Sequence, residues 1–259
     1  MLYCAAKIHL FTQMFSPLIF QVKFVEKTTS SNDEVKKLLN LNLAKEGLAV
    51  YTFFQEKGRG QGSNSWESED GKNVLISVLL EPDFLTIDEQ IYLNMAVSIA
   101  ITDLFKNFEI KNYSIKWPND IFLNEKKIAG ILIENTLQGK SIKNSIIGIG
   151  LNANQTIFNS SKATSLLNET GENFSIESCI QTLLGKISIR YQQLKVGMKN
   201  QLFDDYLNLL YKKNVPSYFK INNQIVLGEI TGVNKNGKLE VLINRQMQYF
   251  ANKEIELLS

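Results

Sequence analysis

The stretch SIKWPNDIFLNEKKIAGILIENTLQGKSIKNSIIGIGLN, residues 114–152, carries the clearest fold signal in this 259-residue sequence. Three runs rich in isoleucine and leucine, at 121–124, 127–135 and 145–151, have the length and composition of β-strands. Short polar turns separate them, Asn124-Glu125-Lys126 and Gln138-Gly139-Lys140, and turns of this length favour antiparallel pairing. The stretch therefore predicts part of a largely antiparallel sheet.

The segments before this stretch add strands and helices to the sheet. Strands are predicted at 48–55 and 73–80, and a further one where apolar residues cluster from Phe20 to Val25. Helices are expected where Ser31 and Glu34, and again Thr86 and Glu89, have the spacing of a capping box. No internal repeat is visible among these elements.

The segments after it change character at Pro216. Helices are predicted at 175–195 and 199–212, and Pro216 then marks a boundary. The remaining residues alternate in short strands and contain the hairpin signal Asn236-Gly237. We expect these last forty-odd residues to form a compact β-barrel.

Composition excludes several classes of protein. The chain is 44% hydrophobic and 21% charged, ordinary values for a globular protein, and its net charge of +2 provides no basic field for polynucleotides. It lacks an apolar run of membrane-spanning length. Two cysteines, Cys4 and Cys179, fit a reducing cytoplasm, and the single histidine, His9, argues against Ser-His-Asp hydrolysis and multi-histidine metal sites. The apolar start is interrupted by polar residues and lacks the pattern of a secretory signal, and Met14 could be a second start.

Two glycine-rich stretches are candidates for ligand contact. In Gly58-Arg59-Gly60-Gln61-Gly62 the glycines let backbone amides approach an anion, and Arg59 adds a forked positive charge; a flexible surface loop is the alternative. Gly148 and Gly150 lie near the end of the predicted 145–151 strand, but no helical pattern comes after it, which argues against a dinucleotide fingerprint. They are expected to allow close packing, or close approach of a ligand, at a strand end.

Two further stretches contain charged residues at strand ends. Pro118 should end its strand or cause a β-bulge in it, which places Asn119 and Asp120 at the end of that strand. There they either bind a ligand or form part of a turn. Trp117 is expected to pack in the core. Lys127 precedes small residues on an apolar strand and could reach into a cleft, or lie at an exposed strand end.

Taken together, these stretches resemble biotin protein ligases (biotin–acetyl-CoA-carboxylase ligases) in their order and spacing, over roughly residues 20–259. The match runs through Ser30-Ser31-Asn32, Gly58-Arg59-Gly60-Gln61-Gly62 with Trp66, Lys116-Trp117-Pro118-Asn119-Asp120, Lys127-Ile128-Ala129-Gly130 and Gly148-Ile149-Gly150-Leu151-Asn152. The resemblance implies an α+β fold: a mixed, largely antiparallel sheet with flanking helices, similar to class II aminoacyl-tRNA synthetases, plus a small C-terminal Src-homology-3-like β-barrel. The domains expected are an N-terminal extension (1–19), a biotin/lipoate ligase-like catalytic domain (20–213) and the β-barrel domain (214–259).

The resemblance also implies an activity. Enzymes of this family use ATP to convert biotin to biotinyl-5′-AMP and then transfer it to a lysine of a biotin carboxyl carrier domain. Biotin, ATP and Mg²⁺ would be the small molecules involved, and a carboxylase's carrier domain the partner. Because only about twenty residues precede the catalytic core, we expect the monofunctional type without a DNA-binding domain. It would bind neither nucleic acid nor membrane and act in the cytoplasm, as a monomer or homodimer.

The site residues follow from the matched motifs. Arg59 and Lys127 are expected to be catalytic, supplying positive charge where two anions meet. Asp120 is expected to bind Mg²⁺. The residues that would bind biotin and the nucleotide are Ser30, Ser31, Asn32, Gln55, Gly58, Arg59, Gly60, Gln61, Trp66, Asn119, Asp120, Lys127, Gly130 and Asn152. Two alternatives share the fold: a lipoate or octanoate ligase or transferase, and a non-catalytic biotin-binding relative.

Overall fold

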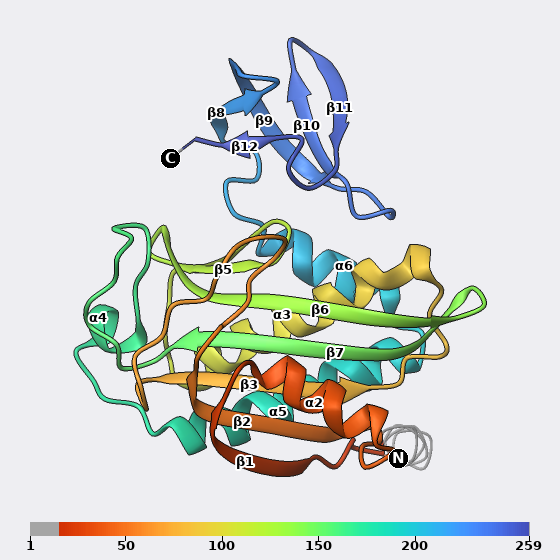
Figure 1. The fold of residues 1–259 in the computed structure, drawn as a ribbon. Coiled ribbons are helices and arrows are strands. Elements are labelled where there is room, and N and C mark those ends of the chain that lie inside the picture. Colours follow the sequence, from red (N-terminus) through yellow and green to blue (C-terminus); the bar gives the residue numbers. More distant parts are fainter. Residues whose placement is uncertain (1–15, 259) are drawn as a thin grey trace, which may run out of the picture.

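The computed structural model describes residues 16–258, so the predictions about Cys4, His9 and Met14, and most of the expected 1–19 extension, lie outside the described residues. Its main element is a seven-stranded sheet (Figure 1). In spatial order the strands are β1 (Gln21–Thr28), β2 (Leu48–Gln55), β3 (Asn73–Leu80), β7 (Ser141–Asn152), β6 (Lys126–Gln138), β5 (Asp120–Leu123) and β4 (Tyr113–Lys116). β1 and β2 are parallel and every other neighbouring pair is antiparallel, which confirms the predicted mixed, largely antiparallel sheet.

Helices cover both faces of this sheet (Figure 1). On one face α3 (Gln90–Asn107), α5 (Ile176–Lys195) and α6 (Lys199–Asn208) pack over the larger apolar core. On the other face α2 (Ser31–Asn40) contacts β2, β3 and β7 through a smaller core that includes Val35, Leu79 and Ile146. Because side chains alternate between the faces of a strand, the central strands β2, β3 and β7 contribute to both cores. Residues 16–258 also contain two short helices, η1 (Ile87–Glu89) and α4 (Leu166–Thr170).

The helix starts agree only in part with the predicted capping boxes. Thr86 and Glu89 form the expected box, with the Thr86 N–H donating to Glu89 Oε2 at 3.2 Å, and it opens η1 directly before α3. The predicted box at Ser31 and Glu34 is wrong, because Ser30 is the N-cap of α2 and no side chain in the described part of the chain caps that helix. Ser31 is unavailable for capping, since its hydroxyl bonds Gln55 and Ser77 instead.

The C-terminal segment forms a second, five-stranded sheet, which lies beyond α6 in Figure 1. Its strands are β8 (Pro216–Ile221), β9 (Gln224–Val233), β10 (Leu239–Ile243), β11 (Gln246–Phe250) and β12 (Glu256–Leu257). All its pairings are antiparallel, and Gly237, at a φ of 79°, occupies the predicted hairpin between β9 and β10. Closure of this sheet into a Src-homology-3-like barrel stays a prediction, as does the boundary at residue 214.

One hydrogen bond joins the two sheets at a position relevant to the site. The indole Nε1–H of Trp117, which is half-buried, donates to the Gly237 carbonyl oxygen at 3.0 Å. The hairpin of the second sheet is thereby held against the turn between β4 and β5. Among residues 16–258 no helix is both long enough and apolar enough to cross a lipid bilayer.

Candidate functional site

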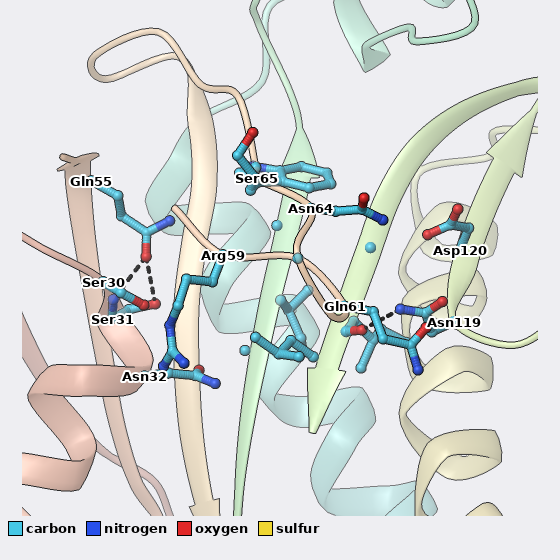
Figure 2. A pocket seen from close by; sticks show the side chains of 18 of the residues that line it. Ser30, Ser31, Asn32, Gln55, Arg59, Gln61, Asn64, Ser65, Asn119 and Asp120 are labelled. Carbon is cyan, nitrogen blue, oxygen red and sulfur yellow. Dashed lines mark hydrogen bonds between the residues drawn. The ribbon is translucent and has the colours of Figure 1, made fainter. Parts of the chain in front are cut away.

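A cavity of about 210 Å³ lies on the α2 face of the main sheet, beneath the loop that connects β2 and β3 (Figure 2). Four parts of the chain form it: the first turn of α2, this loop, the turn and strand that contain Asn119 and Lys127, and the glycine pair of β7. One further lining residue, Asn252, comes from the segment between β11 and β12 of the C-terminal sheet. The cavity is therefore built from segments that are far apart in the sequence.

Most of the predicted site residues line this cavity. They are Ser30, Ser31, Asn32, Gln55, Arg59, Gly60, Gln61, Trp66, Asn119, Asp120, Lys127 and Gly130. Gly58 and Asn152 are not among the lining residues. Gly58 shapes the loop instead, because its carbonyl oxygen accepts from the Trp66 N–H at 2.9 Å. Asn152 is buried and donates from Nδ2 to the Thr164 carbonyl oxygen at 2.9 Å, so it fastens the segment after β7.

A hydrogen-bond chain forms one end of the cavity. Gln55 Oε1 accepts from the Ser31 backbone N–H at 2.7 Å and from the Ser31 hydroxyl at 3.1 Å. Ser77, fully buried on β3, lies 2.7 Å from the Ser31 hydroxyl and donates to Asn32 Oδ1 at 2.5 Å. These groups sit at the N-terminus of α2 and offer an uncharged, polar surface suited to a polar head group.

Arg59 points toward this same end, as Figure 2 shows. Its guanidinium binds Glu134 through both terminal nitrogens, each at 3.0 Å, and Asp33 at 2.7 Å. The loop is folded locally by the Gly60 N–H, which donates to the Asn64 carbonyl oxygen at 2.7 Å. Arg59 therefore ties the loop to the sheet and to α2, rather than facing the end where Lys127 lies.

The other end of the cavity contains Lys127 and Asp120, whose Nζ and Oδ1 atoms are 2.6 Å apart. Lys127 also lies over the Trp66 ring, 5.6 Å from its centroid. Positive charge is concentrated here, as the pKa of the nearby Lys116 shows. Burial lowers this pKa, and the positive charges of Lys162 and Lys127 lower it further, whereas the carboxylate of Asp120 raises it. An anionic ligand would relieve this repulsion between amines, so this end is suited to phosphate or carboxylate.

Trp66 covers two glycines of the sheet floor. A Cβ atom at Gly130 would lie 3.0 Å from Trp66 Cζ3, and one at Gly150 would lie 2.6 Å from Trp66 Cζ2. Any larger residue at either position would displace the indole. Its buried Nε1 atom makes no hydrogen bond within residues 16–258, an unsatisfied donor at the cavity wall.

Sequence reasoning missed several residues that the fold brings to the cavity. Those not predicted as ligand-binding are Asn64, Ser65, Pro118, Ile131, Leu132, Ile149 and Asn252. Gly148 and Gly150, whose spacing suggested close packing or close approach of a ligand, do line the cavity, since two glycines at i and i+2 expose the same face of a strand. Asn252 had no such signal, because it lies in the irregular segment between β11 and β12.

Comparisons with known proteins agree with this arrangement. The model of the biotin/lipoate A/B protein ligase family matches residues 23–152. The bifunctional ligase/repressor BirA of Bacillus subtilis is 33% identical over 168 residues, 63% of this chain and 51% of that protein. The chloroplastic biotin–protein ligase 1 of Arabidopsis thaliana is 27% identical over 227 residues, 82% of this chain and 60% of that protein. The chain thus spans between half and two thirds of the length of these relatives.

Among solved structures, the biotin protein ligase from Aquifex aeolicus in complex with biotin and ATP has the same fold. Its TM-score is 0.77 at 21% sequence identity, and the match covers 92% of this chain and 98% of that one. The similarity extends through the main sheet and into the C-terminal sheet.

Proposed function

Because this chain belongs to the biotin/lipoate A/B protein ligase family, we propose that it is a biotin–[biotin carboxyl-carrier protein] ligase. It would activate biotin with ATP as biotinyl-5′-adenylate and transfer the biotinyl group to a carrier-domain lysine. The observation that carries this proposal is one cavity with two different ends, joined by the glycine loop. One end presents hydroxyl and amide groups, with Arg59 paired to Glu134 and Asp33, and the other end is cationic at Lys127. A molecule with a polar head group and a carboxylate tail fits that polarity.

The head group is assigned to the end that contains Ser31, Asn32 and Gln55. These side chains already hold one another in fixed orientations, with Ser31 bonded to Gln55 and Asn32 to Ser77. Preorganised polar groups lose little further freedom when a ligand binds, so they favour affinity and specificity. Gly148 keeps this floor open, because a Cβ there would lie 2.5 Å from Asn32 Oδ1.

The carboxylate tail and the α-phosphate are assigned to the end with Lys127. In the first step a biotin carboxylate oxygen attacks the α-phosphorus, the bond to the bridging oxygen breaks, and pyrophosphate leaves. Two anions must approach each other, and the Lys127 ammonium lowers that repulsion. In the second step the acceptor lysine amine attacks the acyl carbon and AMP leaves, with Lys127 stabilising the charge on the departing phosphate.

Asp120 is assigned to Mg²⁺. This ion is commonly held by one or two carboxylates together with substrate phosphates, and Asp120 is a carboxylate that lines the cavity. Within the described part of the chain, residues 16–258, no three carboxylate, histidine or cysteine side chains gather to form a protein-only metal site. A single carboxylate, Asp120, therefore fits an ion that arrives with ATP. When bound, that ion would neutralise negative charge on the phosphates.

The loop above the cavity is assigned a shielding role. An acyl-adenylate hydrolyses when water reaches it, and a loop that closes over the ligand prevents this. We predict that biotin plus ATP protects residues 56–66 from protease. Protection that does not change when both substrates are added would count against a shielding loop.

The family also includes lipoate ligases, so membership alone leaves the substrate open. The relatives named above favour biotin, since one is a biotin–protein ligase and the other a bifunctional ligase/repressor. The partner would be the carrier domain of a biotin-dependent carboxylase, and the reaction would take place in the cytoplasm, in keeping with few cysteines.

Exchange of radiolabelled pyrophosphate into ATP tests the proposal. We expect exchange that requires biotin and Mg²⁺ and that lipoate and octanoate do not support. Exchange with lipoate in place of biotin would assign the chain to the other branch of the family. No exchange with any of these acids, from a folded protein, would favour a non-catalytic relative.

A further inference from the structure

Glu134 is a carboxylate on β6 that joins the loop above the cavity to the cavity floor. It accepts from Arg59 Nη1 and Nη2, each at 3.0 Å, and from Asn32 Nδ2 at 2.6 Å. Its two partners come from different elements, the glycine loop and α2. Glu134 does not line the cavity, and neither the matched motifs nor the comparisons give it a role.

The contact with Asn32 determines which way that amide faces. Asn32 Nδ2 donates to Glu134 while Asn32 Oδ1 accepts from the Ser77 hydroxyl at 2.5 Å. A flipped amide would place its oxygen against a carboxylate, which is repulsive, and its NH₂ group against the serine. Because Asn32 is only 2% exposed, no water replaces a lost partner cheaply.

The contact with Arg59 determines where the loop lies. A guanidinium held by both nitrogens on one carboxylate has a defined direction, which a single contact does not give. Asp33 also binds Arg59, through one nitrogen at 2.7 Å, but its side chain is 45% exposed against 31% for Glu134. Glu134 is therefore the better-shielded anchor, and unlike Asp33 it also binds Asn32.

We propose that Glu134 is a positioning residue that latches the glycine loop over the biotin end of the cavity and fixes the orientation of the Asn32 amide. This proposal rests on the proposed function for its ligand, but the latch itself is a property of the free protein. Arg59 then acts mainly through Glu134, as the loop's half of the latch. The cationic end with Lys127 works independently of it.

The first test uses Glu134→Gln, which keeps the shape of the side chain and removes its charge. We expect the KM for biotin in pyrophosphate exchange to rise at least tenfold and the KM for ATP to stay within about twofold, since the latch lies at the biotin end. The matched control is Glu125→Gln, which removes a glutamate whose side chain is 71% exposed and paired with Lys212 outside the cavity. A biotin KM within twofold of wild type, or equal increases in both KM values, would overturn the proposal.

The second test is a double-mutant cycle of Glu134→Gln and Arg59→Gln. If the two residues act as one latch, the double variant has a biotin KM no more than about twofold above the worse single variant. Independent, multiplying effects would show that they do not act through each other. Arg59 lies on a loop, so its variant stays informative if Glu134→Gln fails to fold.

A third measurement separates the latch from the proposed function. Without ligand, protease should cut within residues 56–66 several times faster in Glu134→Gln than in wild type or Glu125→Gln. Equal cutting rates would refute the latch, whatever acid the enzyme activates. Faster cutting in a chain with no biotin-dependent exchange would retain the latch and reject the proposed substrate.

Discussion

Gly150 lies directly beneath the indole of Trp66, and Gly150→Ala would place a methyl group where that ring now sits. The new Cβ would be 2.6 Å from Trp66 Cζ2 and 2.7 Å from Nε1. Carbon atoms pack best at about 3.5–4.0 Å, so the ring would have to retreat by about 1 Å. Trp66 also contacts Lys127 across the cavity, and its movement would disturb the cationic end.

The size of the effect follows from this displacement. Overpacking of this kind costs about 1–3 kcal/mol, and a misplacement of about 1 Å near reacting groups costs up to about 100-fold in rate. We therefore expect biotin-dependent pyrophosphate exchange to fall about 10- to 100-fold, while circular dichroism shows an intact fold. The control is Gly185→Ala on α5, where a Cβ meets, apart from its neighbours in the helix, no atom of residues 16–258 within 4 Å. That variant should keep full activity and gain up to about 1 kcal/mol of stability from helix propensity. Exchange within twofold of wild type in Gly150→Ala would refute the placement of Trp66 at the active cavity.

Three further predictions concern other parts of the molecule. Lys127→Ala should lower the rate of adenylate formation about 100- to 1000-fold, because the variant lacks the charge that stabilises the transition state. In the control Lys126→Ala, which changes an exposed neighbour, the rate should stay within twofold of wild type. Similar losses in both variants would contradict the role assigned to Lys127. Asn252→Ala should slow pyrophosphate exchange by about 2- to 12-fold, which corresponds to the free energy of one neutral hydrogen bond, and should leave the melting temperature unchanged. An unchanged rate would mean that the C-terminal sheet lies beside the site without contributing to it. Burial raises the pKa of the Cys179 thiol from 9.0 to about 12, so between these pH values the unfolded chain loses a proton that the folded chain keeps. The free energy of unfolding should therefore fall as pH rises from 9 to 12, and fall less in Cys179→Ala; parallel curves from chemical denaturation of the two proteins would contradict this.

The strands were predictable from sequence because their apolar runs are long and bounded by polar turns. The bounds of β2 and β3 equal the predicted ones, and β5, β6 and β7 start or end within a few residues of theirs. α6 ends at Asn208, short of the predicted 212, because the Leu209 carbonyl oxygen and the Tyr211 N–H bond the backbone of Ile115 on β4 instead of continuing the helix. Hydrophobic periodicity within a short window of sequence predicts local structure, and it works well here because the strands and helices of this fold are long.

The site was predictable only where its residues lie in matched motifs. Glu134 has no such signal: in sequence it is a polar residue inside a strand, and its role depends on Arg59, 75 positions away, and Asn32, 102 positions away. The prediction that Ser31 caps its helix failed for a similar reason, because Ser77 on a distant strand takes up its hydroxyl. Contacts between remote segments decided each of these outcomes, and no short window of sequence contains them.

The most direct measurement of the central claim is the intact mass of a purified apo carrier domain after incubation with this protein, biotin, ATP and Mg²⁺. We predict that the carrier domain gains the mass of one biotinyl group, on its acceptor lysine, and that the gain is lost when the enzyme carries Lys127→Ala. A carrier domain that stays unmodified with biotin, or is modified when lipoate replaces biotin, would contradict the account.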